Sequence, residues 1–254
     1  MLRKNEIARR LHEYMSERIK GIKVRDVRIG VGYTAVALNR RGTGLAAVIR
    51  ENLEPNCGVV AKAGKLCGIP ATELLGYLTN SRNAVERALG LATANAILSA
   101  EAPDKESDTI ALMNLSSKDH VVMIGLFRPL VPRIEKTGAK LTVLEKQKNK
   151  VLSHVLSFKN RGDILKTCTV AIITATSILN NTLETILNEL GSPRWVSILG
   201  PSTPVCRDIF LGTPVTHLGG SVVLDRPKVM QIVSEGGGTP ALRPYLRFVN
   251  LVLK

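Results

Sequence analysis

From residue 121 onward, short apolar runs alternate with segments of helical periodicity, and this alternation constrains the fold more than any other feature of the sequence. The apolar runs predict strands, and the segments between them predict helices. Strands that are joined through helices run parallel with right-handed crossovers, so the pattern predicts a doubly wound parallel sheet of the α/β class. The predicted strands are 121–124, 141–144, 170–173, 195–199 and 213–215, and the predicted helices are 129–137, 182–190, 206–211 and 226–234.

The first hundred residues have a different pattern. The polar, proline-led segment 103–108 therefore predicts a boundary between an α+β domain over residues 1–101 and a second domain over residues 116–254. The last helix of the first part is apolar nearly all round, which predicts that it is buried. The predicted elements are a helix at 3–20 ended by Gly21, strands at 24–38 and 44–49 with a turn at 39–42, and helices at 70–77 and 83–99.

Composition narrows the class of protein. The first six residues lack the apolar core of a signal peptide, and the longest weakly polar run, 170–179, is too short to span a bilayer. We therefore expect a soluble cytoplasmic protein without a membrane partner. The four cysteines, Cys57, Cys67, Cys168 and Cys206, form no Cys-x-x-Cys pair and are expected to be small buried hydrophobic residues. The sequence leaves open whether the chain forms a homo-oligomer.

The net charge is strongly positive, 35 basic minus 21 acidic residues, or +14. Residues 1–28 contain 9 basic and 4 acidic side chains, and residues 128–166 contain 10 and 3. Such charge steers anionic ligands and is also typical of nucleic-acid binding. Interleaved aromatic residues and a docking motif are both missing, so nucleic acid is the least favoured of the partners considered.

Polar residues and glycines follow the predicted strands, and the carboxyl ends of parallel strands are where ligands bind. Thr174 and Thr176 follow one strand, and Asn180 and Asn181 precede the next helix. The segment Gly200-Pro-Ser202-Thr203-Pro follows another strand, and His217 lies beyond the predicted strand 213–215.

Blocks of the sequence resemble the prokaryotic heavy-metal chelation domain proteins. The blocks are 27–36, 66–74 and 88–96 in the first half, and 125–131, 174–182 and 200–204 through 220–221 in the second. The resemblance implies an enolase N-terminal-like domain, a Rossmann-like domain and a site in the cleft between them. Ala175 and Asn181 stand where the family usually has glycine, and Arg128 stands where it usually has proline.

The residues at the strand ends support two hypotheses about the ligand, and each group of residues could instead have a purely structural role. Gly125 after the first strand and Glu145 at the end of the second could hold S-adenosylmethionine or a nicotinamide nucleotide, although Gly125 lacks the further glycines of the dinucleotide motif. The alternative is a tight turn with a solvated carboxylate. Thr174, Thr176 and Asn180 could instead cradle an anion beside free N–H groups, and the alternative there is helix capping.

The remaining candidates follow the same logic. Ser202 and Thr203, between two prolines after Gly200, could aim N–H groups and hydroxyls at a ligand oxygen. His217 is the candidate metal ligand or general acid or base, or else a histidine satisfied within the core. Asn95, inside the apolar helix, must be hydrogen-bonded either to a neighbouring loop or towards the cleft.

The favoured function is binding of a small anionic or metal-chelating organic molecule, such as a pterin- or flavin-like compound, between two domains. A heavy metal would need ligands assembled from both domains, or would arrive already bound to that molecule, because no histidine or carboxylate group with ligand spacing accompanies His217. A cofactor enzyme and a nucleic-acid-binding module are the alternatives. The sequence identifies no reaction.

Overall fold

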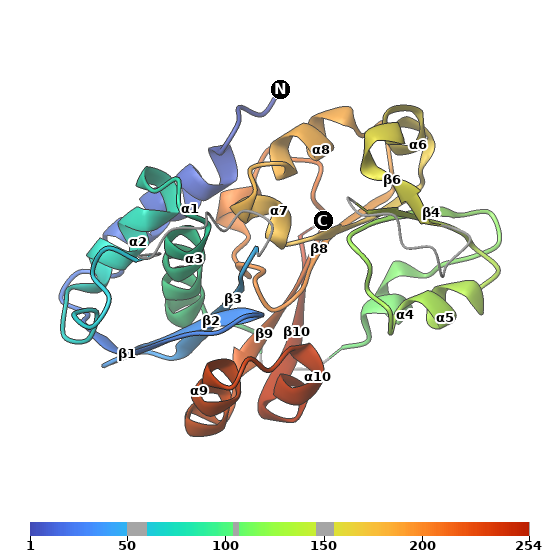
Figure 1. Ribbon diagram of the computed structural model, residues 1–254. Coiled ribbons are helices and arrows are strands. Elements are labelled where there is room, and N and C mark those ends of the chain that lie inside the picture. Colours follow the sequence, from blue (N-terminus) through green and yellow to red (C-terminus); the bar gives the residue numbers. More distant parts are fainter. Residues whose placement is uncertain (50–59, 104–106, 146–154, 254) are drawn as a thin grey trace.

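The computed structural model describes residues 1–49, 60–103, 107–145 and 155–253 (Figure 1). It contains a three-stranded antiparallel sheet from the first half and a seven-stranded, mostly parallel sheet from the second, both packed with helices. The predicted α/β class is confirmed. The enolase-like and Rossmann-like labels stay predictions. Among the described residues, no helix is long and apolar enough to cross a bilayer.

The small sheet has the order β1-β2-β3. The turn at residues 39–42 is confirmed, but residues 24–38 form a hairpin and not a single strand, because the chain reverses at residues 30–32. Its elements are α1 (Glu6–Ser16), β1 (Val24–Ile29), β2 (Tyr33–Leu38), β3 (Thr43–Ala47), α2 (Ala71–Asn80) and α3 (Ala84–Leu98).

Helix α3 lies against one face of this sheet and is buried on nearly every side, as predicted. Asn83 begins it by accepting hydrogen bonds from the backbone N–H groups of Val85 (2.8 Å) and Glu86 (3.2 Å). Gly90 is required by close packing, since a Cβ there would lie 2.5 Å from the backbone nitrogen of Leu78 on α2.

The other face of the small sheet is covered by a helix from the far end of the chain. Helix α9 (Arg226–Ser234) places Val229, Met230 and Val233 against Ala35 and Leu45 in one buried cluster. The first half of the chain thus completes its core with residues from the second half.

The large sheet has the order β10-β9-β8-β7-β4-β5-β6, and its strands are parallel except β10. The apolar runs at 121–124, 141–144, 170–173 and 195–199 are strands as predicted, whereas β6 and β10 were not foreseen. The strands are β4 (His120–Ile124), β5 (Lys140–Glu145), β6 (Val155–Ser157), β7 (Val170–Thr174), β8 (Trp195–Leu199), β9 (His217–Val223) and β10 (Leu246–Val252). The helices besides α9 are α4 (Thr109–Met113), α5 (Val131–Glu135), α6 (Gly162–Thr167), α7 (Thr176–Leu179), α8 (Leu183–Glu189) and α10 (Thr239–Leu242).

The predicted strand at residues 213–215 is wrong, because the strand begins at His217. Pro214 cannot donate to a ladder, and the glycines after His217 mark close packing within β9 and not a turn. A Cβ on Gly220 would lie 2.4 Å from Val205 Cγ2, and one on Gly219 would lie 2.6 Å from Leu199 Cδ2.

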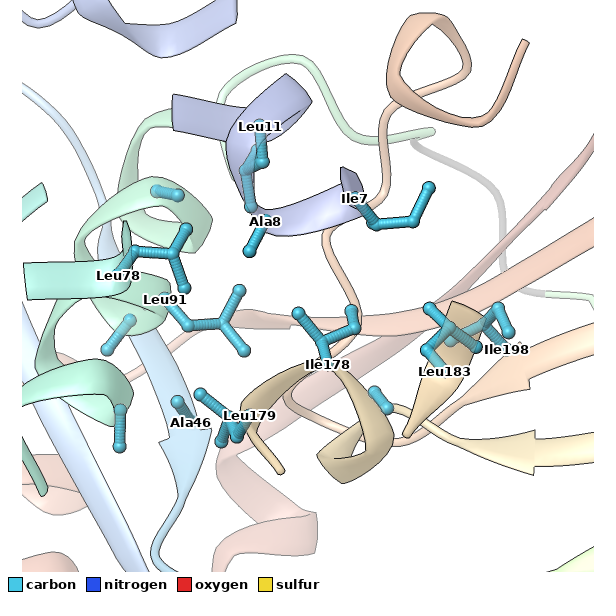
Figure 2. Close-up of a cluster of buried hydrophobic side chains, with 14 of the residues drawn as sticks. Ile7, Ala8, Leu11, Ala46, Leu78, Leu91, Ile178, Leu179, Leu183 and Ile198 are labelled. Atoms are coloured by element: carbon cyan, nitrogen blue, oxygen red, sulfur yellow. The ribbon is translucent and has the colours of Figure 1, made fainter. Parts of the chain in front are cut away.

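The two halves share a hydrophobic core. Figure 2 shows side chains of α1, α2 and α3 meeting those of α7, α8 and β8. The division into domains 1–101 and 116–254 stays a prediction. The labelled residues are Ile7, Ala8, Leu11, Ala46, Leu78, Leu91, Ile178, Leu179, Leu183 and Ile198.

Candidate functional site

Four of the predicted site residues lie at the carboxyl edge of neighbouring strands. Gly125 follows β4, Glu145 ends β5, Thr174 ends β7 and Gly200 follows β8, and these strands are adjacent in the order β8-β7-β4-β5. The chain leaves β4 toward β5 on one side and returns to β7 on the other, so a switch point of the topology lies between β4 and β7. Crevices at such points are the usual ligand sites of open α/β sheets.

At this switch point the chain segments after β4 and at the end of β7 approach closely. Gly125 has φ 86°, and a Cβ on it would lie 2.9 Å from Thr174 Cβ, so only glycine fits without displacement. On the β7 side, the hydroxyls of Thr174 and Thr176 lie 3.0 Å apart, and both residues are half-buried. The structure therefore brings Gly125, Thr174 and Thr176 together.

Glu145 does not stand free at its strand end. Its Oε1 accepts a hydrogen bond of 2.6 Å from the backbone N–H of Leu126, and this bond holds the loop after β4. The next residue, Phe127, reaches across to β8, where its Cε1 lies 3.8 Å from the position of a Cβ on Gly200. One of the two carboxylate oxygens of Glu145 therefore has a structural role in holding the loop.

Ser202 and Thr203 dock the loop after β8 onto the first half of the chain. Ala47 N–H donates to Ser202 Oγ over 2.8 Å. Asn95 Nδ2 donates to the carbonyl of Leu45 over 2.9 Å and to that of Ser202 over 3.2 Å. Asn95 therefore lies at the seam between the halves, as predicted, and the Ser202 hydroxyl is already used in joining them.

Buried oxygen atoms without a hydrogen-bond partner among the described residues gather at this seam. They are Asn95 Oδ1, Thr203 Oγ1 and Thr34 Oγ1, and all three residues are less than a tenth exposed. Thr34 pairs with Ala46 on β3, beside the carbonyl to which Asn95 donates. An unsatisfied buried polar group costs about 1–3 kcal/mol, so polar partners are expected here.

Asn180 does not join the site. Its Oδ1 accepts hydrogen bonds from the backbone N–H (3.2 Å) and the hydroxyl (2.5 Å) of Thr182, which is the capping alternative. Asn181 was expected to begin the next helix, but it has φ 57° and accepts from Arg87 Nη2 over 2.5 Å. Asparagine tolerates this left-handed backbone, in which glycine is favoured, and the loop keeps that geometry.

Arg87 is an important residue that the sequence reasoning missed. It lies on α3, only 5% exposed, and donates to the carbonyls of Leu179 (3.0 Å) and Ile178 (3.2 Å) at the end of α7. It also donates to Asn5 Oδ1 over 3.1 Å. Burial lowers the pKa of its guanidinium. Arg87 thus fixes α7, whose first residue is Thr176, to the first half of the chain. An arginine inside an apolar helix was the signal for it.

The prediction that His217 lies with the strand-end residues is wrong. It begins β9, opposite Ser197, at the amino end of that strand. The ring is fully buried, with Nδ1 2.9 Å from Ser197 Oγ and Nε2 3.0 Å from Asn250 Oδ1. Burial lowers the pKa of His217 to about 4, so it is neutral near pH 7. His217 is a core histidine in a side-chain network.

Direct metal binding by the protein does not fit the described side chains, among which no three His, Cys, Asp or Glu residues form a metal-binding group. Cys168 and Cys206 are buried, and burial raises the pKa of Cys168 to about 11, so a thiolate is disfavoured. Cys67 is exposed, contrary to expectation, and Cys57 lies outside the described residues.

Some basic residues of the two basic segments form ion pairs, and in the first segment their partners are the four acidic residues already counted there. In the first, Arg9, Arg10, Lys20 and Arg28 contact Glu13, Glu6, Glu17 and Asp26, respectively. In the second, Arg133, Arg161 and Lys166 contact Asp108, Glu189 and Asp163. The net positive charge of the first segment is therefore unchanged by its ion pairs.

Two open surface depressions lie away from the carboxyl edge. One, of about 590 Å³, is at the amino edge of the large sheet around the ion pair of Asp119 and Arg194. The other, of about 510 Å³, lies between α1 and residues 208–211. Asp119 is engaged by Arg194, Thr169 and Ser116, so the two opposite charges in the first depression form a structural ion pair.

Comparisons with known proteins agree with the fold. Two family models, both described as "Putative heavy-metal chelation", match residues 12–98 and 108–252. An uncharacterized protein of Methanocaldococcus jannaschii is 24% identical over 230 residues, which cover 89% of this chain and 88% of that protein.

Two crystal structures of proteins of unknown function from the same family are similar. That from Pyrococcus horikoshii has a TM-score of 0.83 at 21% identity and covers 97% of this chain and 99% of its own. That from Desulfitobacterium hafniense has a TM-score of 0.81 at 22% identity, with coverages of 97% and 98%.

Proposed function

Because the chain belongs to the heavy-metal chelation family, we propose that it binds a small anionic or metal-chelating organic molecule at the carboxyl edge of its large sheet, next to the seam between its halves. The observation that carries the proposal is the convergence of Gly125, Thr174 and Thr176 at the switch point between β4 and β7. Close backbone approach on one side and two adjacent hydroxyls on the other suit a ligand that carries oxygen atoms.

The seam supplies a second kind of contact. Asn95 uses both hydrogens of its amide nitrogen on backbone carbonyls, so its Oδ1 can only accept a hydrogen bond. Together with Thr203 Oγ1, it favours a ligand group that carries N–H or O–H. A nitrogen heterocycle with carbonyl oxygens and N–H groups, as in pterins and flavins, has both kinds of atom.

The metal is cargo in this proposal. Soft heavy metals prefer thiolate and imidazole ligands, whereas the crevice offers hydroxyls and one carboxylate that is already hydrogen-bonded. The residues therefore fit the organic part of a metal chelate better than they fit a bare ion.

The test compares Thr176→Val with Thr185→Val, an equivalent change on the exposed surface of α8. Each protein is purified under native conditions from its source organism, and the molecules and metals that it retains are measured by native mass spectrometry and elemental analysis. We expect wild type and T185V to retain the same molecule, and T176V to retain at least tenfold less, with a stability change within about 1 kcal/mol.

Equal retention by T176V and wild type would place the ligand elsewhere. If wild type retains no small molecule, the binding proposal itself is wrong. A metal retained without any organic molecule would also contradict it, because the described side chains provide no metal-binding group.

A further inference from the structure

The loop that follows β4 is held in place by successive residues. A Cβ on Gly125 would collide with Thr174, Leu126 N–H donates to Glu145, and the Phe127 ring reaches Gly200. The backbone N–H of Phe127 also contacts Met123 Sδ at 3.3 Å. The backbone that leads to the next residue, Arg128, is therefore held at the carboxyl edge of the large sheet, which forms the lip of the proposed site.

Arg128 is exposed and makes no hydrogen bond or ion pair with any other residue that the structure describes. The neighbouring arginines differ in this respect. Arg133 on α5 contacts Asp108, and Arg161 contacts Glu189 through two hydrogen bonds. An exposed arginine is commonly just solvated, so its location and surroundings must decide whether Arg128 does more.

The electrostatics of the lip favour a role in binding. The hydroxyls of Thr174 and Thr176 are neutral, so they can orient a negative group but cannot balance its charge. The Glu145 carboxylate at the end of β5 is negatively charged, and its hydrogen bond from the neutral Leu126 N–H does not balance that charge, so an anionic group bound here needs a positive partner. The guanidinium of Arg128 can provide positive charge on the β4 side, and its planar fork matches carboxylate and phosphate groups.

From this arrangement we propose that Arg128 is a specificity-determining residue that selects ligands with a carboxylate or phosphate group over neutral ones. The proposal rests on the function proposed above. It adds that the ligand carries net negative charge and that its anionic group lies on the β4 side of the crevice, opposite the threonine hydroxyls.

The test uses Arg128→Gln, the charge-preserving Arg128→Lys, and Arg40→Gln as a charge-matched control in the exposed turn between β2 and β3. The four proteins, including wild type, are purified natively, and the retained molecule is identified and quantified by mass spectrometry at low and high salt. We expect R40Q to match wild type, R128Q to retain at least tenfold less, and R128K to fall between them. High salt should remove a larger fraction of the retained molecule from wild type than from R128Q, because salt screens the attraction to Arg128.

Equal retention by R128Q and wild type would overturn the proposal, as would a retained molecule without a carboxylate or phosphate group. These outcomes leave the proposed function intact if T176V still loses the molecule. If T176V and R128Q both retain it, the site at this edge is wrong as a whole. A loss in R40Q as large as that in R128Q would show that net charge, and not Arg128, attracts the ligand.

Discussion

Replacing His217 with glutamine should remove a specific part of the acid sensitivity of this fold. His217 is completely buried, and burial lowers its pKa from 6.5 to about 4. Glutamine occupies a similar space and can keep a hydrogen bond to Ser197 or Asn250, but it does not ionise between pH 4 and 7. The variant therefore separates the protonation of this one ring from that of all other groups.

The sign and size follow from the shifted pKa. As pH falls through 6.5, the unfolded chain takes up a proton at His217, whereas the folded protein does not until about pH 4. The folded state therefore loses stability across this window. A difference of about 2.5 pKa units at 1.36 kcal/mol per unit is about 3 kcal/mol. This contribution is complete above about pH 7 and lost below about pH 4.

Denaturant unfolding of wild type and H217Q from pH 7 to pH 4 measures the effect. Between pH 7 and pH 4, the free energy of unfolding of wild type should fall by about 3 kcal/mol more than that of H217Q, since all other ionisable groups are common to both proteins. His12→Gln on α1 is the control for a histidine-to-glutamine change and should show no such convergence. Trp195, the single tryptophan, has its ring centroid 5.3 Å from that of His217, so its fluorescence reports the same protonation. Parallel stability curves, or a fluorescence midpoint near pH 6.5 in folded protein, would refute the reasoning.

Two further predictions concern the joining of the halves. Arg87→Met should lower the free energy of unfolding by about 3 kcal/mol, because buried carbonyls of α7 lose a charged donor. The control, Arg82→Met at an exposed position, should change the free energy of unfolding by less than about 0.5 kcal/mol. Equal effects of the two substitutions in urea denaturation would contradict this prediction. A fragment of residues 1–101 should lack a cooperative thermal transition and should self-associate. The reason is that the face of the small sheet containing Ala35 and Leu45 is no longer covered by α9. A monomeric fragment that melts cooperatively would show that this cover is not needed.

The large sheet was predictable because its strands are buried on both faces and therefore read as continuous apolar runs. That property is local, so the runs at 121–124 and 170–173 could be placed without any knowledge of their neighbours. The same reasoning placed Gly125, Glu145 and Thr174 at one edge, since strand ends in a parallel sheet coincide. The short edge strand β6 and the antiparallel β10 are only partly buried, and their patterns were too weak to recognise.

The errors have a common physical origin in packing between distant segments. Glycines in β9 look like turn residues, but Gly220 is small because Val205 lies against it. This misplaced the start of the strand and with it His217. Arg87 and α9 depend likewise on partners roughly ninety and two hundred residues away, which no local pattern reveals.

The packing of α9 on the small sheet also determines when the first half of the chain can complete its folding during synthesis. Leu45 is made long before Val229, and translation at about 5–20 residues per second separates them by about 10–40 s. Throughout that interval the nascent chain presents the apolar face of β2 and β3 without its final partner. Folding of the first half on the ribosome therefore has to wait for nearly the whole chain, so the growing polypeptide is a natural client for chaperones that bind exposed apolar segments.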